Sequence, residues 1–121
     1  MARQKIKPLN SWETAQVERG PEKGYARMSP TLLTHPAFTA LPLGVRMVYI
    51  NMMGVCKGNN QFCFPRAIYE GKFEIQHSTF CRAVKKLEQA GFIQVKQSGK
   101  NTRTPNVYQF VDTWKKAARP P

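Results

Sequence analysis

Two side chains that could do chemistry together, His77 and Cys81, lie four residues apart in a stretch with the pattern of a helix. That spacing places them on one side of a helix, where an imidazole could act as the base for a thiol nucleophile. A zinc site is conceivable if Cys56 and Cys63 joined them. Zinc ligands usually come as closely spaced pairs, however, and six residues separate these two cysteines. We therefore expect no metal and no cofactor.

Other catalytic groups are sparse. The acidic residues are six scattered Glu and one Asp, Asp112, and the second histidine, His35, is distant from His77 in the sequence. The phosphate-binding pattern GxxxxGK[ST] does not occur. Because an active site needs several such groups with matched roles, we expect that the protein is not an enzyme.

The same stretch carries three cations, Arg82, Lys85 and Lys86. Basic side chains can bind an anionic partner, and arginine can do so with two parallel hydrogen bonds. Lysines on a helix are more often a solvated face, so the three cations alone do not decide between the two interpretations.

The charge of the whole chain favours an anionic partner. Of 121 residues, 19 are Lys or Arg and 7 are Asp or Glu, which gives a net charge of +12 and a pI near 10.1. Such an excess of positive charge is self-repelling, and nucleic acid, an anionic membrane surface or a ribosome could relieve the repulsion.

The apolar run 41–55 is shorter than the ~20 residues of a membrane span. Three irregularly spaced cysteines and a basic start without an apolar segment favour reduced thiols in the cytoplasm.

The elements that would position these residues can be placed from local signals. Residues 1–24 read as a mobile basic arm, 25–116 as one folded domain and 117–121 as a frayed end. The predicted helices are 30–33, 36–39, 43–55, a short helix after Pro65, and 77–90; two strands, 92–97 and 107–111, flank a turn-rich segment. The predicted class is α+β, mostly α with a small β hairpin. The helix 43–55 is apolar on nearly every side, so it should be buried in the domain or against a second copy.

The helix 77–90 has two distinct faces. At 100° per residue, Val84 and Leu87 fall within about 40° of Phe80, and Ala83 flanks this apolar stripe. The polar residues of the opposite side are Ser78, Arg82, Lys85 and Gln89. Packing of the stripe would therefore direct these polar side chains outward.

The stretch from Phe64 to Phe110 resembles a winged helix-turn-helix DNA-binding domain. The residues that carry the likeness are Thr79, Phe80, Arg82, Ala83, Val84 and Leu87, followed by Gly91, Phe92, Ile93 and a candidate wing at 97–106. The preceding segment, SPTLLTHPAFTALPLGVRMVYINMMGVCKGNNQF, looks like the leader of such domains in mobile-element and phage replication or regulatory proteins. The chain departs from the pattern at Gln76-His77, where a serine is usual, so the helix cap falls at His77 or Ser78.

The resemblance implies double-stranded DNA as partner, a recognition helix at about 77–90 and a winged-helix domain spanning 25–116. The residues that it implies for DNA binding are His77, Ser78, Thr79, Arg82, Lys85 and Lys86 on the helix and Lys100, Asn101 and Arg103 on the wing. Transcription regulation and replication initiation or partition of a mobile element are the two implied settings. A protein of this size would act as a homodimer, with the helix 43–55 as the interface.

Two other function classes remain open. Winged helices also serve as protein–protein adaptors without DNA contact, and a likeness of fold does not exclude that use. The basic arm would suit RNA or a ribosome, although the chain lacks the aromatic sheet signature of RNA-binding modules.

Overall fold

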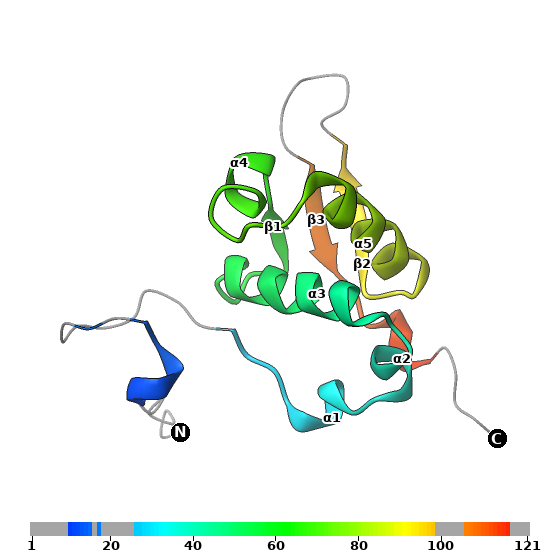
Figure 1. The fold of residues 1–121 in the computed structure, drawn as a ribbon. Coiled ribbons are helices and arrows are strands. Elements are labelled where there is room, and N and C mark those ends of the chain that lie inside the picture. Colours follow the sequence, from blue (N-terminus) through cyan, green and yellow to red (C-terminus); the bar gives the residue numbers. More distant parts are fainter. Residues whose placement is uncertain (1–9, 16, 18–25, 99–105, 117–121) are drawn as a thin grey trace, which may run out of the picture.

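A computed structural model describes residues 10–15, 17, 26–98 and 106–116 of the chain (Figure 1). The elements of these residues, in chain order, are η1 (Ser11–Glu13), α1 (Pro30–Leu33), α2 (Pro36–Thr39), α3 (Leu43–Val55), β1 (Gln61–Cys63), α4 (Arg66–Tyr69), α5 (His77–Gln89), β2 (Ile93–Gln97), β3 (Val107–Phe110) and η2 (Thr113–Lys115), where η marks a short 3-10 helix. The strands form one antiparallel sheet in the order β1-β3-β2. The described residues therefore have an α+β fold, as predicted, with five α-helices and a small three-stranded sheet.

The helix starts follow the local signals in the sequence. The Ser29 side chain accepts a hydrogen bond from the backbone N–H of Leu32, and Pro30 occupies the first position of α1. Pro65 directly precedes α4. The predicted helices 30–33, 36–39 and 43–55 are confirmed, and the predicted helix 77–90 ends one residue earlier. The predicted N-terminal arm (1–24) and C-terminal end (117–121) lie mostly or wholly outside the described residues.

The sheet is larger than the predicted hairpin. Strands β2 and β3 pair as expected, but β1 adds a third strand through the pairs Gln61–Gln109, Phe62–Tyr108 and Cys63–Val107. A segment of three residues is too short to show an alternating pattern, so local sequence could not identify it as a strand. Its pairing depends on β3, which lies more than forty residues later in the chain.

The core joins α3, α5 and the sheet. Helix α5 packs against α3 and β2. The ring of Phe92 lies at the centre, with ring centroids 5.2 Å from Tyr49, 5.2 Å from Trp114 and 6.0 Å from Phe38. Trp114 thus packs back onto the domain. Burial of these rings fixes α5 against the rest of the molecule.

The end of α5 depends on Gly91. Its φ is +84°, a backbone conformation that side-chain-bearing residues rarely adopt. A Cβ atom at this position would lie 2.5 Å from the Thr113 hydroxyl, which donates a hydrogen bond to the Gly91 carbonyl oxygen. The glycine therefore lets the chain turn from α5 into β2 in close contact with η2.

A tight turn connects α4 to α5. Glu74 adopts a left-handed backbone with φ of 54°, and the backbone N–H of Ile75 donates to the carbonyl of Tyr69 over 2.8 Å. The Ile75 side chain is buried, so this turn is anchored in the core. Figure 1 shows α4 at one end of the molecule and α1 and α2 at the other.

None of the helices in the described ranges is long and apolar enough to cross a membrane.

Candidate nucleic-acid interface

Helix α5 presents a polar face because its opposite face is packed. Phe80, Ala83 and Leu87 are at most 3% exposed. Val84, expected in the centre of the stripe, is only partly buried, so the buried stripe is centred closer to Ala83 than its periodicity predicted. The polar residues Ser78, Arg82, Lys85 and Gln89 are exposed, as expected.

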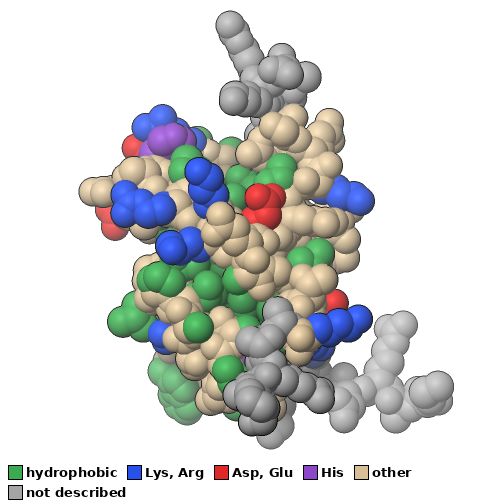
Figure 2. Space-filling model, turned by 90° about the vertical axis from the view of Figure 1, so that its right-hand side faces the viewer, with side chains coloured by type: hydrophobic (Ala, Val, Ile, Leu, Met, Phe, Trp, Pro, Cys, Tyr) green, Lys and Arg blue, Asp and Glu red, His purple; other side chains and the backbone are tan. Residues whose placement is uncertain are grey.

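The three cations of α5 are available to a partner. Arg82, Lys85 and Lys86 are all exposed, and none of them forms an ion pair with another described residue. Glu88 is the one acidic residue of the helix, which leaves a positive surface. Figure 2 views the side of the molecule that α5 and β2 form, and shows a group of Lys and Arg side chains beside a histidine in its upper half.

Two other arginines are occupied within the fold. Arg66 forms an ion pair with Glu70 one turn later in α4, and its hydrogen bond lowers the pKa of the Glu70 carboxyl. Arg46 donates hydrogen bonds to the carbonyl oxygens of Thr39 (2.7 Å) and Leu41 (2.8 Å). It thereby satisfies carbonyls at the end of α2 and of the turn that follows. Neither guanidinium is as free for an anionic ligand as that of Arg82.

The start of α5 differs from the expected cap. The cap residue is Gln76, not His77 or Ser78, and its side chain makes no capping hydrogen bond. The side chains of Ser78 and Thr79 are exposed in the first turn. Since no side chain caps the first backbone N–H groups of the helix, they and the two hydroxyls can donate to an anion.

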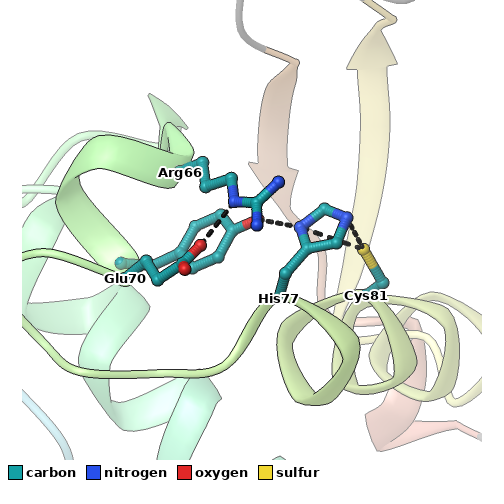
Figure 3. A network of polar contacts seen from close by, with 5 residues as sticks. Arg66, Glu70, His77 and Cys81 are labelled. Carbon is teal, nitrogen blue, oxygen red and sulfur yellow. Dashed lines mark hydrogen bonds and ion pairs between the residues drawn. The ribbon is translucent and has the colours of Figure 1, made fainter.

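His77 is exposed, but its ring is held in place from two sides (Figure 3). The Tyr69 hydroxyl lies 2.5 Å from Nδ1, and the Cys81 Sγ lies 3.5 Å from Nε2. Tyr69 is itself fixed by stacking on Phe80, with centroids 3.8 Å apart, and burial raises the pKa of its hydroxyl. Sequence reasoning missed the role of Tyr69, because only the turn between α4 and α5 brings it to His77.

Of the predicted wing, 97–106, the structure describes only residues 97, 98 and 106. Lys100, Asn101 and Arg103 lie outside the described residues. The strands on either side, β2 and β3, pair antiparallel, and β2 carries an exposed Lys96 close to the end of the strand. Sequence reasoning did not single out Lys96. The alternation along this strand places its side chain on the face opposite to that of the apolar Ile93 and Val95.

No metal-binding group of three or more His, Cys, Asp or Glu side chains exists within the described part of the chain. Cys56 is buried, with its thiol donating to the Met53 carbonyl over 3.2 Å, whereas Cys63 and Cys81 are exposed.

Comparison with known proteins finds no family model, no curated protein and no solved structure that matches this chain.

Proposed function

We propose that this protein binds double-stranded DNA through a winged helix-turn-helix in which α5 is the recognition helix and the β2–β3 connection is the wing. The observation that carries the proposal is the outward face of α5, where Arg82, Lys85 and Lys86 are exposed without ion pairs to described residues. The same packing that buries Phe80 and Leu87 directs these cations away from the core.

The dimensions and order of the elements support this proposal. Helix α5 has 13 residues, hence a length of about 20 Å, and the major groove of B-form DNA is about 12 Å wide and accepts one helix. The short helix α4 and an anchored turn come before α5, and an antiparallel strand pair follows it. In this arrangement the N-terminal half of α5 would face the bases.

We assign the contacts by side-chain chemistry and position. Arg82 lies at the centre of the polar face and can donate two parallel hydrogen bonds to guanine. Ser78 and Thr79 would donate to phosphate near the uncapped helix start, and Lys85 would contact phosphate about two turns further along α5. His77 and Lys86 would contact the phosphate backbone at the two flanks of α5. On the wing, Lys100, Asn101 and Arg103 remain the proposed contacts with phosphate or the minor groove.

This activity fits two cellular processes. They are the regulation of transcription and the initiation of replication or partition of a mobile element. Both would take place in the cytoplasm.

Selection of bound duplexes from a random pool at two salt concentrations tests the proposal. We expect enrichment of a defined sequence and a slope of log affinity against log salt of about −4 to −7, if about five to eight cations contact phosphate. A chain that shifts no duplex at low salt would contradict DNA binding and favour a protein–protein adaptor.

We further propose that the outer face of α3 pairs with a second copy of this chain. Leu43 and Met47 are 75% and 55% exposed on that face. The single charged side chain of α3, Arg46, is engaged by two carbonyls. Since two copies with a net charge of +12 repel one another over most of their surface, an apolar face without a free charge is where they can approach.

The substitution Met47→Glu tests this pairing by sedimentation equilibrium. We expect a dimer for the original chain and at least a tenfold weaker association for the variant, because the new carboxylate would be buried opposite its own copy. Val17→Glu is the matched control, since Val17 is 98% exposed and far from α3 in the sequence. A monomeric original chain at high concentration would contradict the proposal.

A further inference from the structure

A chain of three polar groups, the Tyr69 hydroxyl, the His77 imidazole and the Cys81 thiol, runs from α4 to the exposed surface of α5 (Figure 3). The hydroxyl oxygen is 2.5 Å from Nδ1, and Sγ is 3.5 Å from Nε2 and 3.9 Å from Nδ1. When the ring proton is on Nδ1, it can be donated to the Tyr69 oxygen, and Nε2, the ring nitrogen nearer to the thiol, is left as the unprotonated one. Such an order of groups, with a nucleophile, a base and a residue that orients the base, is the one that activates thiols.

The three cysteines of the chain differ in the two properties that govern thiol reactivity, access and a nearby proton acceptor. Cys56 is buried and bonded to a backbone carbonyl. Cys63 is exposed on β1, and among the described residues its thiol has no hydrogen-bonding partner. Cys81 alone combines exposure with an imidazole within reach.

We propose that Cys81 is a modification site that takes low-molecular-weight disulfides, with a preference for anionic ones. The thiol proton passes to His77 Nε2, and the sulfur attacks one sulfur of the disulfide RS–SR. A Cys81–S–SR bond forms as the RS–SR bond breaks, and the leaving RS⁻ takes the proton from the imidazolium. The disulfide is the oxidant, so the step needs no other reactant.

The preference for an anionic disulfide follows from the neighbours of Cys81. Arg82 is the next residue, and Lys85 lies one helical turn further on the same side. Both are exposed and form no ion pair within the described residues. They would raise the local concentration of an anion such as oxidised glutathione, an effect that salt screens.

Modification at this position would regulate the proposed DNA contact, and this consequence rests on the proposed function. At 100° per residue, Cys81 lies about 40° from Lys85 and about 100° from Arg82, at the edge of the exposed polar face of α5. A bulky anionic group on its sulfur would occupy the space that the groove wall needs and would repel phosphate. Reduction of the mixed disulfide would restore the surface.

The first experiment measures thiol reactivity without DNA. The full chain is treated with oxidised glutathione, and modification of each cysteine is followed by peptide mass spectrometry. We expect Cys81 to react about tenfold faster than Cys63, the exposed control without an imidazole. His77→Gln should remove this advantage, and Tyr69→Phe, which keeps the ring that stacks on Phe80, should reduce it.

The anion preference is measured in parallel with the neutral 2-hydroxyethyl disulfide. We expect the ratio of the two rates at Cys81 to favour oxidised glutathione at low salt and to fall at high salt, with little change at Cys63. Equal rates at Cys81 and Cys63, or an unchanged rate in His77→Gln, would overturn the proposal.

The second experiment measures duplex binding before and after treatment with oxidised glutathione. We expect at least a tenfold loss that dithiothreitol reverses, present in Cys63→Ser and absent in Cys81→Ser. A loss that persists in Cys81→Ser would overturn the regulatory role. If the untreated chain binds no duplex, the proposed function fails, while the reactivity of Cys81 is still decided by the first experiment.

Discussion

The substitution Phe92→Ala is expected to lower the free energy of unfolding by about 3–5 kcal/mol, as large-to-small changes of buried aromatic residues do. Phe92 is fully buried, and its ring contacts the rings of Phe38, Tyr49 and Trp114. These partners come from α2, α3 and η2, so the cavity would open where three separate segments meet. Urea denaturation at equilibrium measures the loss.

Two controls show whether the loss comes from the cavity. Phe92→Leu keeps most of the volume and should cost clearly less than the alanine variant. Trp12→Ala removes a larger ring that is 82% exposed, and should change stability by less than about 0.5 kcal/mol. A loss below about 1 kcal/mol for Phe92→Ala would show that the aromatic cluster is not the centre of the core.

The substitution Arg82→Ala is expected to weaken binding to the selected duplex by about 1–3 kcal/mol, the usual contribution of a base-reading arginine. Its guanidinium is exposed and without an ion pair among the described residues, so nothing in the fold competes with DNA for it. Binding to random duplex should fall much less. Fluorescence anisotropy with the two duplexes measures both affinities.

Charge and hydrogen-bond geometry can be separated with two further variants. Arg82→Lys keeps the charge but loses the paired donors, so it should lose preference for the selected duplex while random binding is retained. Lys86→Ala removes one charge at the flank of α5 and should weaken both duplexes alike, with a salt slope smaller by about 1. If Arg82→Ala instead weakens both duplexes equally, Arg82 is a phosphate contact.

The fold could be predicted from the sequence where local signals are complete. Ser29-Pro30 marks the start of α1, Gly91 marks the end of α5, and each acts through its own backbone geometry and immediate neighbours. The strand β1 could not be predicted, because three residues carry no period and their pairing with β3 is a long-range contact.

The candidate site was likewise predictable in part. The exposure of the cations of α5 could be predicted from its helical period, since burial of one face necessarily exposes the other. The cap at Gln76 was not predictable, because the turn that Glu74 and Ile75 form decides where α5 begins.

The sequence by itself determined the two faces of α5, the large positive charge and the order of the helices and of β2 and β3, because these depend on residue type and on spacing along the chain. Only the tertiary structure decided which polar groups are free. It engages Arg46 with two carbonyls, and it brings Tyr69 against His77 and His77 against Cys81. The physical reason is that a hydrogen bond depends on distances of about 3 Å between atoms, and the packing of α4, α5 and the core sets those distances.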